Sequence, residues 1–89
     1  MTIPSKLTRN FVETDVDDEV LLVDLDGGEL FSLADSARAI WRLIDGKRDI
    51  EAIVAELAAS FDDPRETIRA DCGEFVARLA AAGLISAEA

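Results

Sequence analysis

The stretch EVLLVDLDGGELFSL, residues 19–33, decides the fold of this chain. Val20–Leu25 is a run of strand-forming residues. Asp26-Gly27-Gly28 follows as a turn signal, because glycine adopts the positive φ angles that a tight hairpin requires. Gly28–Leu33 then returns as a second strand, so the stretch predicts a β-hairpin.

The second strand of this hairpin is predicted to be an edge strand. The chain turns helical at Ala34-Asp35-Ser36, and no later segment has the pattern of a strand. An uncovered edge is either blunted, here by Glu29, or used to bind another strand, and we expect it to be used. The alternation of the strand places Phe31 and Leu33 on one face, and Leu30 and Ser32 on the other.

Composition narrows the classes of function. The 89 residues form one domain near the lower size limit for unaided folding. A single cysteine excludes an internal disulfide and a cysteine-cluster metal site. The absence of histidine removes the commonest general base and the commonest metal ligand, and no metal or cofactor is expected. The net charge of −10 disfavours a nucleic-acid partner. No transmembrane run or signal peptide is present, which predicts a cytoplasmic protein with no membrane partner.

The segment before the hairpin completes a small sheet. Residues 1–8 are expected to be a flexible arm, and residues 9–86 a single domain. Asn10–Thr14 predicts a short first strand anchored by Phe11 and Val12, with Asp15–Asp18 as the turn that follows. The acidic residues of this turn lack the spacing of a calcium loop.

Three helices are predicted after the hairpin. The first covers about 35–45, is capped by Asp35 or Ser36, and ends at Gly46. Asp49 caps the second. Their buried residues recur at helical spacing: Ala37, Ile40, Trp41 and Ile44 in the first, and Ile50, Ile53, Val54, Leu57 and Phe61 in the second.

The third helix has the clearest start. In Asp63-Pro64-Arg65-Glu66 a capping side chain precedes proline at the first helical position, and the helix ends at Gly83, after which Leu84 and Ile85 fold back. Its predicted buried stripe is Ile68, Cys72, Phe75 and Leu79, with Val76 on its shoulder. A three-stranded antiparallel meander followed by three α-helices is an α+β fold with the outline of a winged helix-turn-helix.

Four segments resemble the PqqD-like family from about Val20 to Ile85. They are LFSL at 30–33, ADSARAIW at 34–41, LIDGKRDIEAIVAEL at 43–57 and DCGEFVARLAAAGLI at 71–85. The resemblance implies a non-catalytic RiPP recognition element, which binds the leader segment of a ribosomally made, modified peptide. The namesake of the family is a peptide chaperone of pyrroloquinoline quinone biosynthesis.

The resemblance also implies where the leader docks. The leader of such a protein adds a strand to Gly28–Leu33 and lies in the groove between that strand and the third helix, Pro64–Ala82. The chain departs from the family pattern in two places. Leu33-Ala34 replaces Leu-Asn, so the cap of the first helix passes to Asp35 or Ser36. Leu25-Asp26-Gly27-Gly28 replaces the Pro-Glu-Gly of the pyrroloquinoline quinone members, which disfavours that role. A freestanding recognition protein of another pathway, first of all lasso peptides, is therefore expected, with a modifying enzyme or leader peptidase as second partner.

The candidate peptide-binding residues lie on these two elements. They are Gly28, Glu29, Leu30, Phe31, Ser32 and Leu33 on the strand, and Arg69, Asp71, Cys72 and Val76 on the third helix. Each has a structural alternative, because Leu33, Cys72 and Val76 also fit a core. Arg69 pairs with an acidic leader residue or with a neighbouring carboxylate, and Asp71 binds a basic leader residue or is solvated. Trp41 is expected to be a core residue.

Three other classes of function compete with leader binding. A winged-helix DNA-binding protein would need a basic recognition helix, whereas the last two helices are rich in Glu and Asp. The sequence has no histidine, no paired cysteine, no glycine-rich phosphate loop and no plausible carboxylate dyad, which disfavours an enzyme. Edge-to-edge pairing would give a weak homodimer instead of a monomer.

Overall fold

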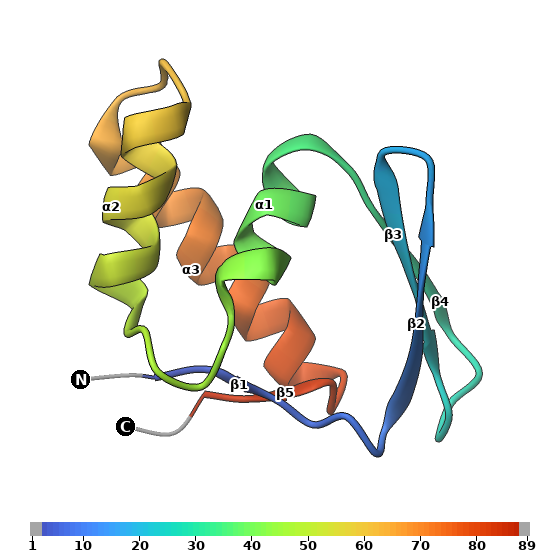
Figure 1. The fold of residues 1–89 in the computed structure, drawn as a ribbon. Helices are drawn as coiled ribbons and strands as arrows, with labels where there is room; N and C mark the ends of the chain where they lie inside the picture. The colour runs from blue at the N-terminus through green and yellow to red at the C-terminus, as the bar shows by residue number, and fades with distance from the viewer. Residues whose placement is uncertain (1–2, 88–89) are drawn as a thin grey trace.

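The computed structural model describes residues 3–87 as a small sheet beside three helices (Figure 1). The helices are α1 (Asp35–Leu43), α2 (Ile50–Ser60) and α3 (Arg65–Ala81). The strands are β1 (Ser5–Lys6), β2 (Phe11–Val16), β3 (Glu19–Asp24), β4 (Leu30–Leu33) and β5 (Ile85–Ser86). The α+β class and the three-strand, three-helix order are confirmed. None of the helices that residues 3–87 form has the length and apolar character needed to cross a lipid bilayer.

The main sheet has the strand order β2-β3-β4, all antiparallel, which leaves β4 at an edge as predicted. The first strand is longer than expected, because Val16 still pairs with Glu19. The turn is therefore only Asp17-Asp18, with Asp17 at a φ of 56°, a conformation that aspartate tolerates. Val12 does not anchor the strand, since it is 50% exposed.

A second, two-stranded sheet was missed by the sequence analysis. Ser5 pairs with Ser86 and Lys6 with Ile85, which joins the two ends of the chain as β1 and β5. Pro4 is fully buried, and the Lys6 Nζ atom lies 4.4 Å from the centre of the Trp41 ring. Residues 4–6 are thus packed into the fold and are not the free arm that was expected; the first two residues of that arm lie outside the described residues. Two-residue strands paired across about 80 positions leave no local pattern in a sequence.

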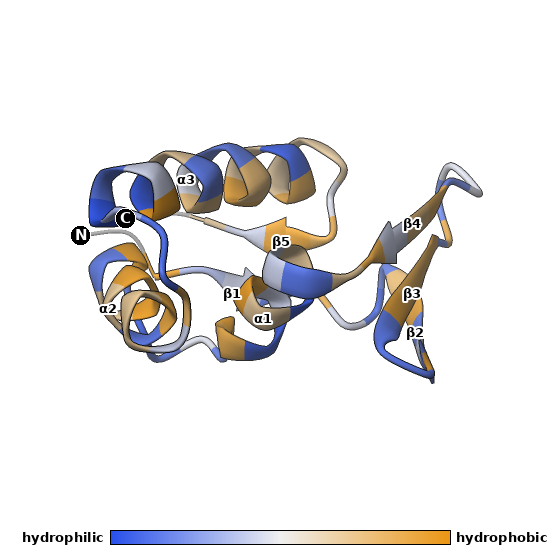
Figure 2. Cartoon of the chain, turned by 90° about the horizontal axis from the view of Figure 1, so that it is seen from above, coloured by the Kyte–Doolittle hydropathy of each residue, from blue (hydrophilic) through white to orange (hydrophobic). Residues whose placement is uncertain are grey.

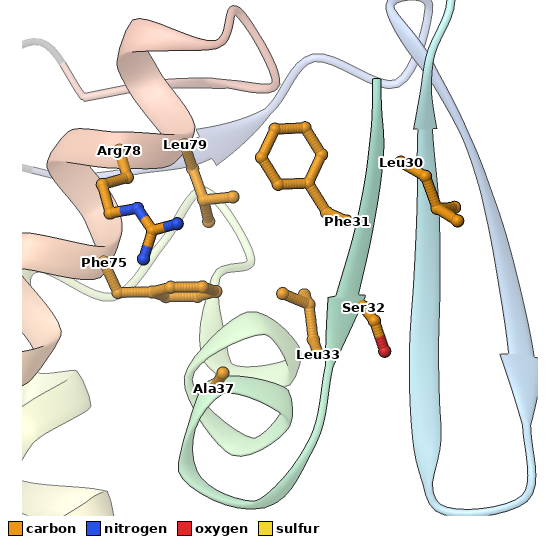
Figure 3. A pocket seen from close by; sticks show the side chains of 8 residues that line it. All are labelled: Leu30, Phe31, Ser32, Leu33, Ala37, Phe75, Arg78 and Leu79. Atoms are coloured by element: carbon orange, nitrogen blue, oxygen red, sulfur yellow. The ribbon is translucent and has the colours of Figure 1, made fainter. Parts of the chain in front are cut away.

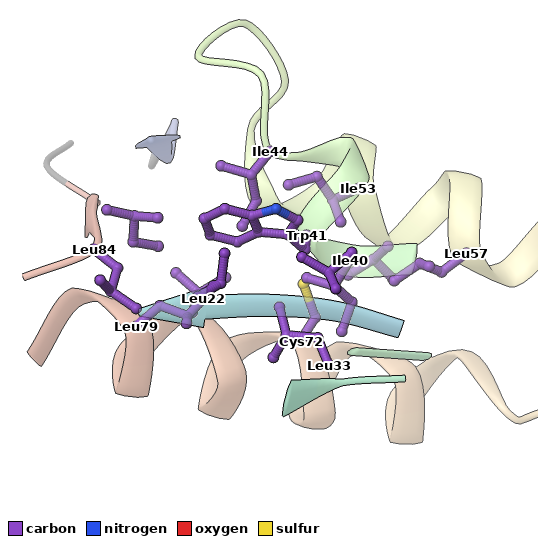
Figure 4. Packing of buried hydrophobic residues seen from close by; sticks show 14 of the residues in the cluster. Leu22, Leu33, Ile40, Trp41, Ile44, Ile53, Leu57, Cys72, Leu79 and Leu84 are labelled. Atoms are coloured by element: carbon purple, nitrogen blue, oxygen red, sulfur yellow. The ribbon is translucent and has the colours of Figure 1, made fainter. Parts of the chain in front are cut away.

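One core joins the sheet to the helices (Figure 4). Trp41 is completely buried, as predicted, and its ring meets Phe11 edge-on at a centroid distance of 5.3 Å. Most predicted core residues are buried, but on α3 the order of two neighbours is reversed. Val76 is 5% exposed and Phe75 only partly buried, because the face of α3 turned toward β4 is not fully covered.

Only one of the three predicted side-chain caps forms. Asp49 accepts a hydrogen bond from the Ala52 backbone N–H at 2.8 Å and caps α2. Helix α1 begins after Ala34 without a side-chain cap and ends at Leu43, two residues before the predicted end. Helix α3 begins after Pro64, and Asp63 does not cap it, because proline itself occupies the capping position. At the other end Gly83 takes a φ of 78° and Leu84 folds back to the Leu79 carbonyl, as predicted.

Candidate functional site

An open cleft of about 280 Å³ lies between β4 and α3 (Figure 3). One wall comes from the edge strand and the other from the C-terminal half of the long helix. Its lining residues are Leu30, Phe31, Ser32, Leu33, Ala37, Phe75, Arg78 and Leu79. The cleft thus lies beside the edge of the main sheet that β4 forms.

The strand wall presents side chains and main chain in alternation. Phe31 and Leu33 point toward α3, whereas Leu30 and Ser32 point to the opposite face of the sheet (Figure 3). Leu30 and Ser32 therefore meet the cleft through their main chain.

The hydrogen-bond pattern of the hairpin fixes which main-chain groups of β4 are free. The Asp24 N–H donates to the Glu29 carbonyl at 2.8 Å, in register with the β3–β4 pairing. Antiparallel pairs alternate, so Phe31 and Leu33 also pair toward β3, and the N–H and C=O groups of Leu30 and Ser32 point to the open edge. The edge thus offers two donor–acceptor pairs at the correct spacing for another strand.

The helix wall consists of residues at positions i, i+3 and i+4 of α3. Phe75 and Leu79 form an apolar floor, with Leu79 almost completely buried. Arg78 is exposed at the cleft and forms no ion pair with any carboxylate of residues 3–87. The cleft is therefore apolar at its base and carries one free cation on the helix side.

Four of the six predicted strand residues line the cleft. Leu30, Phe31, Ser32 and Leu33 line it, although Leu33 is 4% exposed and also belongs to the core. Gly28, at a φ of 71°, and Glu29 lie in the turn before β4 and do not line the cleft. The Ser32 hydroxyl donates to the Glu19 carboxylate on the outer face of the sheet at 3.0 Å.

The predicted residues of α3 are placed elsewhere. Cys72 and Val76 are buried in the core, and burial, helped by the negative charge of Glu51, raises the pKa of the Cys72 thiol. Asp71 lies at a separate small hollow beside Phe61.

Arg69 is engaged with α2. Its guanidinium donates two hydrogen bonds to Glu51, at 2.8 and 3.0 Å. That hydrogen-bonded contact raises the pKa of Arg69 and lowers the pKa of the Glu51 carboxyl. The pair links two helices on a surface away from the cleft lining.

Three residues of α3 that line the cleft were not chosen from the sequence: Phe75, Arg78 and Leu79. Two of them were assigned to the buried stripe, and their spacing with Arg78 was the available signal. The sequence pattern alone does not show which side of an apolar stripe meets the edge strand.

The comparisons with known proteins show the family of the chain. The family described as Coenzyme PQQ synthesis protein D, PqqD, matches residues 19–85, which include β4, the cleft and all three helices. The chain belongs to the PqqD family. The match confirms the resemblance given above.

A solved structure, "TbiB1 in Complex with the TbiA(beta) Leader Peptide", has the same fold. It matches with a TM-score of 0.82 and 31% sequence identity over 94% of this chain and 98% of that one. No curated protein matches the chain. Among residues 3–87, no three His, Cys, Asp or Glu side chains are grouped so that they could hold a metal ion.

Proposed function

We propose that this PqqD-family protein binds the leader segment of a precursor peptide and presents the peptide to another enzyme. The observation that carries the proposal is the open edge of β4 beside an apolar cleft. Two findings support it: membership of the family, and the similarity to TbiB1, which was solved with a leader peptide bound.

The leader docks as a fourth strand of the main sheet. Its main chain pairs with the outward N–H and C=O groups of Leu30 and Ser32, which provide affinity with little dependence on leader sequence. Its side chains alternate, so every second one enters the cleft against Phe31, Phe75 and Leu79. Arg78 favours an acidic leader residue at the helix wall.

The chain itself performs no chemistry in this proposal. A modifying enzyme or a leader peptidase of the same pathway is the second partner and acts on the peptide while its leader is held. The departure from the pyrroloquinoline quinone pattern at Leu25-Asp26-Gly27-Gly28 favours another pathway, and the lasso-peptide class is our first choice because it often uses such short discrete recognition chains.

The family description also supports a second function, that of a chaperone for the precursor of pyrroloquinoline quinone. Calorimetric titration with the leader of a lasso precursor and, in parallel, with a pyrroloquinoline quinone precursor peptide discriminates the two. We expect the lasso leader to bind more tightly; tighter binding of the other peptide would replace our first choice.

The docking itself is tested with two substitutions at Ser32. Ser32→Pro removes one outward N–H, which an edge strand tolerates because that group has no partner within the sheet. The leader should then bind at least about tenfold more weakly, or about 1.4 kcal/mol.

Ser32→Ala is the matched control. It keeps the N–H and removes only the hydroxyl that contacts Glu19, so the leader affinity should stay within about twofold. Circular dichroism verifies that both variants are folded. Equal affinities of folded Ser32→Pro and the unmodified protein would show that the leader does not pair with β4.

A further inference from the structure

The outer face of the main sheet is unusually apolar for a surface that no helix covers. Figures 1 and 2 both show the helices on the opposite side of β2, β3 and β4. The register places Val12, Val23 and Leu30 in one row across the three strands, and they are 50%, 39% and 62% exposed. Val16 and Leu21 lie on the same face, where polar Thr14, Glu19 and Ser32 stand between them, and Leu25, 57% exposed, follows β3 in the turn. These six residues are called the outer patch below.

The outer patch is not needed to bury the core. The alternate residues of the same strands, such as Val20, Leu22 and Leu33, already pack against the helices. The solvated face of an antiparallel sheet is normally polar. A cluster of exposed apolar side chains on such a face, such as Val12, Val23 and Leu30, is typical of a site of interaction.

The charges around the outer patch indicate its partner. Every charged residue in the two turns that end the sheet is acidic: Asp17 and Asp18 in one, and Asp26 and Glu29 in the other. A second copy of this chain, with its net charge of −10, would bring acidic turns against acidic turns. A surface with an apolar centre and a rim of Lys and Arg is complementary to the patch.

The position of the outer patch relates it to the leader. Leu30 contributes its side chain to the patch and its main chain to the open edge. A leader strand added there extends the same sheet, and its outward side chains lie beside Leu30 on the face of the outer patch.

We propose that the outer patch is the docking surface for the enzyme that acts on the leader-bound peptide, and that this enzyme presents an apolar surface rimmed by basic residues. This inference rests on the proposed function, because the enzyme then contacts this chain and the leader strand together. The inner cleft holds the leader while the outer face of the sheet binds the enzyme.

The test uses Val23→Lys, at the centre of the outer patch, and Ala70→Lys, on the exposed surface of α3, as the matched control. Both variants add one positive charge at a surface position. The probes are the purified modifying enzyme and leader peptidase encoded beside this gene, and the leader of the neighbouring precursor. Association is measured by biolayer interferometry and leader binding by calorimetry.

We expect Val23→Lys to weaken the enzyme association at least about tenfold and to leave leader affinity within about twofold. Ala70→Lys should change neither. Added salt should slow association of the enzyme, because the acidic turns attract it.

Three results would overturn the inference: unchanged enzyme affinity of Val23→Lys, no association of either enzyme with the unmodified protein, or a homodimer in light scattering that Val23→Lys dissociates. Failure of the leader to bind the unmodified protein would instead overturn the proposed function, so the two failures are separable.

Discussion

Two arginines of α3 illustrate how much depends on the position of a single residue. Arg69 and Arg78 are nine residues apart, which is two and a half turns, so they lie on opposite sides of the helix. Arg69 is held by Glu51 of α2, whereas Arg78 is exposed at the cleft. The arginine that the sequence analysis selected is therefore the one that already has a partner.

This difference predicts unequal effects of the same substitution. Arg78→Ala should weaken the binding of a leader with an acidic residue near the helix wall about three- to tenfold, because it removes the free cation of the cleft. The control, Arg69→Ala, should leave the affinity within about twofold. Calorimetric titration at low and high salt measures both. Equal losses in the two variants would contradict the assignment of Arg78.

Val76 and Phe75 are neighbours with different roles. Val76 is 5% exposed, so Val76→Glu places a carboxylate in the core and should lower the free energy of unfolding by more than about 3 kcal/mol. Loss of leader binding by that variant would report loss of the fold. Phe75→Ala instead removes part of the cleft floor and should keep the fold while it weakens leader binding about tenfold.

Urea denaturation monitored by circular dichroism, together with calorimetry, separates these effects. A stable Val76→Glu variant would show that Val76 is less enclosed than the structure has it. Unaltered leader binding by Phe75→Ala would exclude the helix wall from the site.

At the scale of elements, the starts of α2 and α3 look alike in sequence but differ in structure. Each is preceded by an aspartate, yet only Asp49 accepts a backbone hydrogen bond, from Ala52. Helix α3 begins after Pro64, whose ring fixes its own φ angle and leaves Asp63 outside the cap. An aspartate before a helix therefore caps it only when the aspartate itself occupies the N-cap position, as Asp49 does and Asp63 does not.

The two aspartates predict different losses of stability. Asp49→Ala should lower the free energy of unfolding by about 1 kcal/mol, since the first turn of α2 loses a cap. Asp63→Ala should change it by less than about 0.5 kcal/mol, because Asp63 caps nothing. Urea denaturation of both variants measures the difference. A loss from Asp63→Ala as large as that from Asp49→Ala would indicate that Asp63 caps α3 in solution.

At the scale of the whole molecule, binding and stability are linked. In the proposed complex the leader pairs with a strand edge that exists only in the folded protein, so binding should stabilise the folded state. At a leader concentration of one hundred times Kd the stabilisation is about 2.7 kcal/mol. For a domain of this size the Tm should rise by roughly 10–20 °C.

Differential scanning calorimetry measures this rise, with a scrambled leader as the control. No rise with a leader that binds in titration would mean that the peptide has similar affinity for the unfolded chain.

The sequence by itself determined the parts of this protein that local patterns encode. The hairpin at residues 19–33 follows from alternation and from the glycines of its turn, and the three helices follow from their apolar spacing and from stops such as Gly83. The edge position of β4 follows as well, because three strands in sequence order leave the last one open.

Tertiary structure decided what no local pattern carries. The pairing of β1 with β5 joins residues about 80 positions apart. The rotation of α3 about its axis determines that Phe75 and Arg78, and not Cys72 and Arg69, line the cleft beside β4. An apolar stripe tells which side of a helix is buried, but all residues of the stripe lie within about 100° of one another around the helix axis. Packing of the whole chain then selects which of them lines the cleft.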